Sequence, residues 1–378
     1  MPEDFPLILW ALLTLFTGGV LSFAASPLVR QFAHTVGAID VPRDGRRMHT
    51  KPTPRLGGLA IFLGFLVAVL LFADIDRSLQ GILLGAVVVV VLGVIDDIVR
   101  LPAWIKFLVQ IGAALIPVFH GVVIEFFSNP IVFSATDYID LGFLAKPLTV
   151  LWIVAITNSV NLIDGLDGLA AGVSAISSVS LLVISLILMQ PNVAILMAAL
   201  AGACVGFMPY NFNPAKMFMG DTGATFLGFI LASVSVMGLF KFYTIISFAV
   251  PFLILGLPIF DTLSAVFRRL ARGKSPMSAD RGHIHHRLID MGFSQKQSVA
   301  ILYTLSSILA VAAVVLTTSG ELKAMLFILA VLVAVALSAK LFGGKKKAGQ
   351  PPEPAAANGS AEGPPEQADA APPESPVE

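Results

Sequence analysis

The chain has 378 residues, of which 56% are hydrophobic and only 13% are charged, and its mean hydropathy is +0.87. This composition excludes a water-soluble globular protein, in which about a quarter of the residues are charged. A hydrocarbon core about 30 Å thick needs roughly 20 apolar residues per helical span, and runs of that kind recur along most of the chain. The sequence therefore predicts an all-α integral membrane protein that crosses the bilayer many times.

The apolar runs predict a polytopic bundle of about eleven transmembrane helices. In chain order they cover residues 5–26, 57–73, 79–95, 104–123, 147–163, 168–189, 192–209, 222–240, 244–263, 298–317 and 323–342. The second and fifth runs are short and contain glycine, so ten helices are the alternative. We interpret the first run as a retained helix because Glu3 and Asp4 precede it, where a signal peptide carries basic residues.

The composition changes abruptly after Phe342 to lysine, proline, alanine, glutamate and glycine. Such a stretch cannot bury an apolar core. The chain therefore divides into a transmembrane domain, residues 1–342, and a tail, residues 343–378, that we expect to be disordered.

Lysine and arginine are distributed unevenly between alternate loops. When the loop after the first span is placed inside the cell, 20 of the 24 lysine and arginine residues fall in cytoplasmic segments. Cytoplasmic loops carry this excess. We therefore expect a multi-pass protein of the cell membrane with its N-terminus outside and its C-terminus in the cytoplasm. The outside segment 124–146 alternates apolar and polar residues, which predicts a short hairpin.

Four polar clusters interrupt or end the predicted spans, and carboxylates near hydrocarbon indicate function by default. The first, LGVIDDIVR at 92–100, ends a span in Asp96 and Asp97. Two adjacent negative charges repel each other unless a cation lies near them. Lys106, near the start of the next span, could return to the same place. A solvated helix end explains this motif alone equally well.

The second cluster is NSVNLIDGLDGL at 158–169, in which a polar residue recurs at every third position. These residues are Asn158, Asn161, Asp164 and Asp167. On a helix they would form one ridge with each side chain beside the next. A structural helix gains nothing from amides and carboxylates in apolar surroundings, so this ridge is the most specific signal in the chain.

The third cluster, MFMGDTG at 217–223, has Asp221 between glycines just before a predicted span. Helix capping alone is one explanation, because a carboxylate can satisfy the first free amides of a helix. Magnesium binding is the other, since Mg²⁺ prefers oxygen ligands from one or two carboxylates together with substrate phosphates. Asp221 together with Asn161 would suit that requirement.

The fourth cluster is SADRGHIHHRL at 278–288, in the longest and most basic cytoplasmic loop. Its three histidines raise the alternative of zinc, but no cysteine is near and the spacing is not a usual zinc pattern. Histidine and arginine are better suited to donate hydrogen bonds to sugar oxygens and a diphosphate. Attraction of the basic residues to the membrane surface is the other alternative.

All four clusters fall on the predicted cytoplasmic side, although the topology was derived from lysine and arginine alone. The loop HTKPTPRLGG at 49–58, with Lys51 and Arg55, lies on that side too. The sequence therefore predicts one shared active site at the cytoplasmic face.

From about residue 37 to residue 300 the ordered motifs resemble those of the polyprenyl-phosphate N-acetylhexosamine-1-phosphate transferases, the family of WecA, TagO and MraY. The resemblance implies attack by a lipid phosphate on the β-phosphorus of a UDP-sugar, which yields a lipid-diphosphate sugar and UMP. It also implies a requirement for Mg²⁺, with Mn²⁺ as an alternative. The expected partners are the UDP-sugar donor, the polyprenyl phosphate acceptor and the membrane, with no nucleic acid; a homodimer is left open.

The resemblance also implies functions for individual residues. The metal ligands would be Asn161 and Asp221. Catalytic roles would fall to Asp96, Asp97, Lys106 and Asp164. Substrate binding would involve Lys51, Asn158, Asp164, Asp167, Phe218, His283, His285, His286 and Arg287. Among these, Asp164 and Phe218 match positions that hold the uridine, and the histidine stretch matches a loop that reaches the sugar and diphosphate.

Two departures from the MraY pattern favour the WecA and TagO branch, whose donor is UDP-N-acetylglucosamine. Arg100 stands where MraY-type proteins have lysine, and His-Ile-His-His replaces three consecutive histidines. The expected reaction is then the first membrane step of cell-envelope polysaccharide or teichoic acid synthesis. A UDP-muramoyl-pentapeptide donor is the alternative. An ion-coupled transporter is the alternative from another class, but the carboxylates gather at one face and no repeat relates the two halves.

Overall fold

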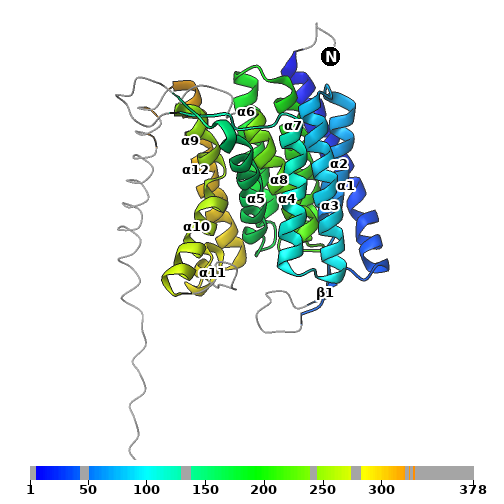
Figure 1. Ribbon diagram of the computed structural model, residues 1–378. Coiled ribbons are helices and arrows are strands. Elements are labelled where there is room, and N and C mark those ends of the chain that lie inside the picture. Colours follow the sequence, from blue (N-terminus) through cyan, green and yellow to red (C-terminus); the bar gives the residue numbers. More distant parts are fainter. Residues whose placement is uncertain are drawn as a thin grey trace, which may run out of the picture. The chain divides into compact units, whose positions relative to one another are not determined.

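The computed structural model describes residues 6–42, 51–128, 138–238, 245–273 and 282–319, together with Lys323 and Phe327. These ranges contain twelve α-helices and four short strands (Figure 1). The helices are α1 Leu7–Thr35, α2 Gly57–Phe72, α3 Arg77–Val99, α4 Ala103–Phe119, α5 Ala145–Ile163, α6 Leu169–Ile187, α7 Pro191–Asn211, α8 Gly220–Gly238, α9 Ile245–Ile254, α10 Gly256–Ala271, α11 Ile284–Asp290 and α12 Gln295–Ser319. Strand β1, Ile39–Asp40, pairs antiparallel with β2, Thr53–Pro54.

Seven helical segments are long and apolar enough to cross a membrane. They are α1, α3, Gly142–Ile163, α6, α7, α8 and most of α12. Helices α2 and α4 are shorter apolar helices. The prediction of an all-α polytopic membrane protein is confirmed, whereas the predicted count of eleven spans is not. The eleventh predicted span and the tail lie outside the described residues, apart from Lys323 and Phe327.

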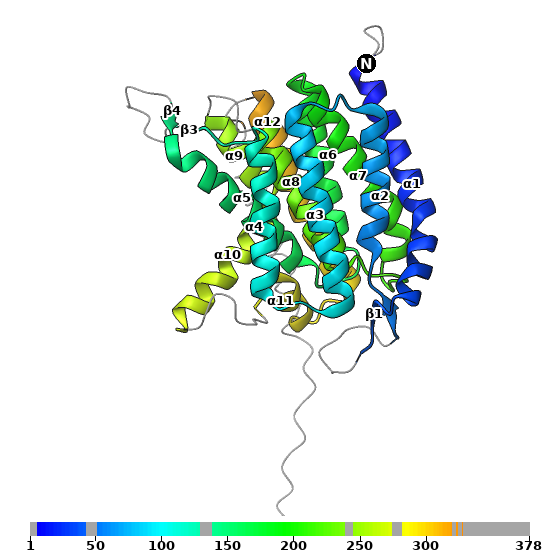
Figure 2. The same cartoon turned by 45° about the vertical axis from the view of Figure 1, so that its right-hand side comes forward.

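The predicted span 244–263 is divided into two helices, α9 and α10. Leu255 separates them with a backbone conformation outside the helical region (φ −96°, ψ 16°). Pro258 in the first turn of α10 has no amide hydrogen to donate to the preceding turn. The division gives α10 its own direction, and its C-terminal end points away from the bundle (Figure 2).

The hairpin predicted within 124–146 is confirmed. Strand β3, Phe126–Ser128, pairs antiparallel with β4, Tyr138–Asp140. The hairpin lies at the end of the bundle opposite β1 and α11 (Figure 2). Which of these two ends faces the cytoplasm stays a prediction.

Helix α8 is the central helix of the bundle and is surrounded by α2, α3, α5 and α6 (Figure 1). Every residue from Thr222 to Gly238 is buried. Glycines allow the neighbouring backbones to approach its N-terminus, because a Cβ on Gly58 or Gly93 would overlap the backbone of Gly223 or Thr222. Small residues at helix interfaces permit such close packing in membranes. This packing brings the ends of α2 and α3 against the start of α8.

Large apolar side chains cover the outer faces of the helices. Phe16 and Leu28 on α1, Leu71 on α2 and Phe267 on α10 are all more than half exposed. A soluble monomer rarely exposes continuous apolar surface on this scale. These faces suit contact with lipid chains, which agrees with a bundle that spans the membrane.

Candidate active site

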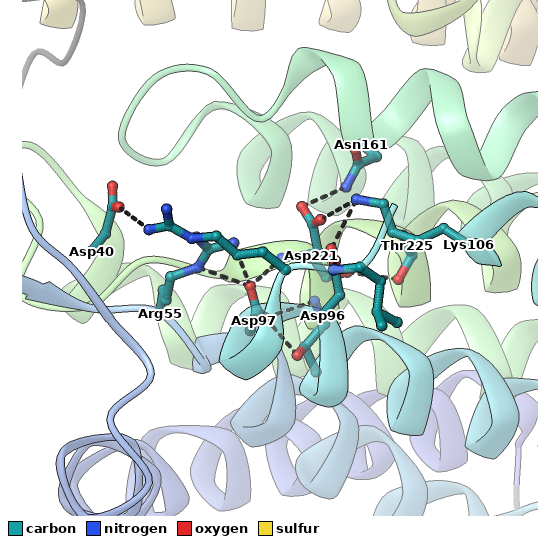
Figure 3. Close-up of polar contacts among 11 residues, drawn as sticks. Asp40, Arg55, Asp96, Asp97, Lys106, Asn161, Asp221 and Thr225 are labelled. Carbon is teal, nitrogen blue, oxygen red and sulfur yellow. Dashed lines mark hydrogen bonds and ion pairs between the residues drawn. The ribbon is translucent and has the colours of Figure 1, made fainter. Parts of the chain in front are cut away.

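Helices α3, α4, α5 and α8 each bring a polar side chain from near one of their ends into a single cluster (Figure 3). The ammonium group of Lys106 donates to Asp96 Oδ2 at 2.8 Å and to Asp221 Oδ2 at 2.9 Å. The amide of Asn161 donates to Asp221 Oδ1 at 3.0 Å. Residues from the first three motifs therefore meet in one cluster, although Asn161 and Asp221 are 60 positions apart in the sequence.

The geometry of this cluster depends on where α3 ends and where α8 begins. Helix α3 stops at Val99, where Arg100 takes a left-handed conformation (φ 59°), so Asp96 lies in the last turn. The Asp96 carboxylate also accepts from the backbone amide of Leu101 at 2.7 Å. Gly220 starts α8 with φ 74°, and a side chain there would collide with Asp97. Glycine at this position therefore lets the start of α8 approach the end of α3.

Asp97 has a different environment from its neighbour Asp96. It is 4% exposed. Its Oδ1 accepts from Arg55 Nε and Nη2 at 2.9 and 2.8 Å and from the Asp221 amide at 3.1 Å. Its Oδ2 accepts from the amide and hydroxyl of Thr222 at 3.0 and 2.7 Å. Asp97 therefore caps the N-terminus of α8 from another helix, as an N-cap side chain would.

A cavity of about 310 Å³ opens beside this cluster. Its volume is at the lower end of the range for small-molecule sites. Predicted site residues that line it are Asn161, Asp164, Asp167, Phe218, Asp221 and His286. Asp40, Asn211 and Gln295 line it as well, although no sequence motif pointed to them. The cavity thus joins the second, third and fourth motifs.

The predicted polar ridge is helical only in its first half. Helix α5 ends at Ile163, so Asp164 and Asp167 lie in the turn before α6. The prediction of an i, i+3 ridge is wrong for these two residues because the backbone leaves the helical region at Asp164 (φ −76°, ψ 55°), the C-cap of α5. Asp164 follows the predicted membrane span, and burial, followed by the negative charges of Asp221 and Asp97, raises its pKa to about 8.

Asp167 ties this turn to the segment that follows α7. Its Oδ2 accepts from Asn213 Nδ2 at 2.9 Å and from the Ala215 amide at 3.0 Å. The hydroxyl of Tyr303 on α12 donates to the Gly168 carbonyl at 2.6 Å. These contacts hold the turn between α5 and α6 against the segment that follows α7 and against α12.

Five residues predicted to bind substrate do not line the cavity: Lys51, Asn158, His283, His285 and Arg287. Asn158 donates to Gln110 Oε1 at 2.7 Å and to the Val154 carbonyl at 2.8 Å. Lys51 and Arg287 are exposed. Their assignment to substrate binding stays a prediction.

The histidine segment packs against the turn between α5 and α6. The rings of His283 and His285 are stacked with centroids 5.7 Å apart, and those of His285 and His286 are 4.3 Å apart. A Cβ on Gly165 would overlap the His285 ring. Burial, followed by the neighbouring charge of His286, lowers the pKa of His285 to about 4. Of these rings, that of His286 reaches the cavity.

The acidic cluster has the ligand types that Mg²⁺ requires. Asp96 and Asp221 direct carboxylate oxygens at one point, where the Lys106 ammonium supplies a positive charge. The Asn161 amide has an oxygen that accepts and an NH₂ group that donates. A rotation of this amide would present its oxygen to a metal ion. Among the described residues no group of three or more His, Cys, Asp and Glu is arranged to hold a metal ion. Mg²⁺ sites completed by substrate phosphates need only one or two carboxylates.

The fold and the cluster define a polytopic membrane protein with one charged site at one end of its helices. Residues 79–239, from α3 to the end of α8, match the model of glycosyl transferase family 4. The probable undecaprenyl-phosphate N-acetylglucosaminyl 1-phosphate transferase of Bacillus subtilis (strain 168) is 42% identical over 310 residues, 82% of this chain and 85% of the relative. The chain belongs to this transferase family.

Two further relatives show the breadth of the family. The decaprenyl-phosphate N-acetylglucosaminephosphotransferase of Mycolicibacterium smegmatis (strain ATCC 700084 / mc(2)155) is 35% identical over 352 residues, 85% of this chain and 86% of the relative. The phospho-N-acetylmuramoyl-pentapeptide-transferase of Halalkalibacterium halodurans (strain ATCC BAA-125 / DSM 18197 / FERM 7344 / JCM 9153 / C-125) is 32% identical over 325 residues, 81% of this chain and 97% of the relative.

Proposed function

We propose that the protein transfers N-acetylglucosamine 1-phosphate from UDP-N-acetylglucosamine to undecaprenyl phosphate or another polyprenyl phosphate and releases UMP. The observation that carries the proposal is the convergence of Asp96, Lys106, Asn161 and Asp221 at one end of a membrane bundle. The 42% identity to the Bacillus subtilis relative supports the choice of donor and acceptor. The lower identity of the pentapeptide transferase makes UDP-muramoyl-pentapeptide the second candidate donor.

The chemistry of the reaction agrees with a site built from charges. A phosphate monoester has a second pKa near 6, so the acceptor lipid is mostly dianionic at neutral pH and needs no strong base. The reaction depends instead on positioning and on neutralising a crowded polyanion. Mg²⁺ or Mn²⁺ bound to Asp221 and Asn161 would supply part of that neutralisation at the donor diphosphate.

The residues of the chain would supply the rest. Lys106 already bridges two carboxylates, and it is long enough to turn toward a phosphate that enters the site. Asp96 would orient the acceptor or remove its last proton. Asp97 has every acceptor position engaged, so we assign it to holding α8 and not to the acceptor. On the donor side, Phe218 and Asp164 would hold the uridine, and His286 would reach toward the sugar and diphosphate.

We propose direct transfer. An oxygen of the lipid phosphate forms a bond to the β-phosphorus of the donor, while the bond from that phosphorus to the bridging oxygen breaks and UMP leaves with the electron pair. The rival route passes through an aspartyl phosphate. Labelled UMP that exchanged into UDP-N-acetylglucosamine in the absence of lipid would establish the rival route.

The proposal is tested with purified protein, Mg²⁺, undecaprenyl phosphate and UDP-N-acetylglucosamine, with UMP release as the measurement and EDTA as the control. We expect release that needs both substrates and stops with EDTA. A parallel reaction with UDP-muramoyl-pentapeptide tests the second donor. If no UDP-hexosamine gives UMP, the proposal is wrong and ion-coupled transport becomes the better reading.

Asp221→Ala should lower the turnover number by about a thousandfold or more, because it removes a metal ligand and a partner of Lys106. Arg272→Ala is the control, since Arg272 is exposed at the end of α10 and outside the cavity. Its turnover should stay within about twofold of the wild-type value. Equal losses in the two variants would show that the site has been assigned to the wrong residues.

A further inference from the structure

Asp261 on α10 is a buried carboxylate that lies outside the four sequence motifs. It is 1% exposed. Its Oδ2 lies 2.8 Å from His283 Nδ1, and its Oδ1 accepts from the Ile284 amide at 2.8 Å. A buried carboxylate is costly unless it is paired, and these two partners both come from the histidine segment.

The contact with Ile284 compensates for a helix that lacks its own cap. Ile284 is the first residue of α11, and its N-cap, His283, makes no side-chain capping bond. The first amides of a helix need a partner from outside the helix. A helix as short as α11, with seven residues, is not stable by itself. Asp261 therefore determines where α11 begins.

The contact with His283 fixes the ring at the start of a stacked row. The carboxylate can only accept, so Nδ1 of His283 carries the hydrogen and Nε2 faces the other way. The ring stacks on His285 at an interplanar angle of 10°, and His285 in turn contacts His286, which lines the cavity. The row thus connects Asp261 to the cavity without direct contact between them.

We propose that Asp261 is a positioning residue for the donor: it anchors α11 and the histidine row so that the row forms one wall of the cavity. This inference rests on the proposed transferase function. It predicts that loss of Asp261 weakens the use of the UDP-sugar more than the use of the lipid acceptor.

The kinetic test compares Asp261→Ala, Asp261→Asn, His283→Ala and the Asp261→Ala/His283→Ala double variant in the full-length protein. Asp261→Ala and His283→Ala should each raise KM for UDP-N-acetylglucosamine about tenfold, with KM for undecaprenyl phosphate within about twofold of wild type. The double variant should be within about twofold of the worse single variant, because both changes break the same contact. Asp290→Ala is the control, since Asp290 is an exposed carboxylate on the same helix.

Hydrogen exchange tests the anchoring without turnover. Amides of residues 284–290 should exchange about tenfold faster in Asp261→Ala than in wild type or Asp290→Ala. Asp261→Asn should keep most of the protection, because its amide oxygen can still accept from Ile284. Asp261→Asn should nevertheless raise KM for UDP-N-acetylglucosamine. The NH₂ group of the new side chain faces Nδ1 of His283 and requires the tautomer in which Nδ1 carries no hydrogen.

The outcomes separate the two proposals. Three results would each overturn the positioning role while wild-type turnover stands. The first is an amide exchange rate of residues 284–290 in Asp261→Ala that equals that of the wild type. The second is a KM for UDP-N-acetylglucosamine in Asp261→Ala that equals that of Asp290→Ala, and the third is additive effects of Asp261→Ala and His283→Ala on that KM. A wild-type protein that releases no UMP would overturn the transferase function and, with it, the donor role of Asp261.

Discussion

Asp96 and Asp97 are neighbours in the sequence, yet they face different partners. Asp96 contacts Lys106 and the Leu101 amide, whereas Asp97 contacts Arg55 and the start of α8. The adjacent pair in the sequence indicates only that a cation should lie near. The packing of α3 against α4 and α8 decides which donors each carboxylate meets.

The two aspartates should therefore respond differently to amide substitution. Asp97→Asn breaks a buried ion pair and places an NH₂ group next to other hydrogen-bond donors. This change should lower the free energy of unfolding by about 3 kcal/mol. We expect its Tm in detergent to fall by roughly 5 °C or more. Asp96→Asn should lower kcat about a hundredfold with less than half that change in Tm. Matching changes in Tm for the two variants would contradict the division of roles.

Lys106 pairs with Asp221, the carboxylate that we propose as a metal ligand, so the ammonium group and a divalent cation should compete for it. Lys106→Met should tighten Mn²⁺ binding without substrate about tenfold, because Asp96 and Asp221 lose their resident cation. Free Mn²⁺ is measured by electron paramagnetic resonance. Lys146→Met is the control, since Lys146 lies over the Phe119 ring and away from the cluster. Weaker Mn²⁺ binding by Lys106→Met would mean that the lysine assists the metal instead.

At the scale of elements, the sequence identifies apolar helices better than it identifies their ends. The ridge from Asn158 to Asp167 has a helical period, but α5 stops at Ile163 and the two aspartates reach the cavity from a turn. The predicted span 244–263 becomes two helices. In both places glycine or proline permits the break, and contacts with other helices determine its position.

The packing of α11 should depend on pH through His285. Its ring faces His283, His286 and the Asp261 carboxylate, and its pKa of about 4 lies below the ordinary value near 6.5. When the His285 ring is released from this packing, its pKa returns to about 6.5. Below pH 6.5 the released ring therefore binds a proton, whereas the packed ring, with a pKa of about 4, stays neutral. The stabilisation is therefore complete above pH 6.5 and is lost as the pH falls toward 4.

Between pH 7.5 and pH 5 this effect should remove about 2 kcal/mol from the packed state of the histidine segment. Tm is measured at both values for the wild type and for His285→Asn, which lacks a titrating ring. The wild type should lose more Tm on acidification than the variant does. An equal loss in the two proteins would assign the pH dependence to other groups.

At the scale of the whole molecule, the site and the β3–β4 hairpin lie at opposite ends of the bundle (Figure 2). Lysine and arginine predict that the site end is cytoplasmic. This orientation would give the site access to a soluble nucleotide sugar while the apolar faces of the helices lie in the bilayer.

The orientation is tested with single cysteines in a Cys204→Ala background, since Cys204 is buried and is the only cysteine. Phe143→Cys lies beside the hairpin at a residue that is 87% exposed. It should react with a membrane-impermeant maleimide on intact cells. Arg272→Cys at the end of α10 should react only after the cells are permeabilised. The reverse pattern would invert the topology and place the site outside.

The sequence by itself determined that the chain is a membrane protein, where most of its apolar helices lie, that a hairpin follows residue 124, and to which family it belongs. Hydrophobicity and the polar motifs of a family are properties of short stretches of sequence, so they do not depend on knowledge of the tertiary structure. It also named Asp96, Lys106, Asn161 and Asp221 as members of one site.

Only the tertiary structure decided that Asp97 caps α8, that Asp164 and Asp167 lie in a turn, and that Asp40, Asn211 and Gln295 line the cavity. Nor does any local pattern point to Asp261, since its partner His283 is 22 positions away. The physical reason is the same in each case. The role of a polar side chain is set by the donors and acceptors that folding brings within about 3 Å of it, and those come from other helices.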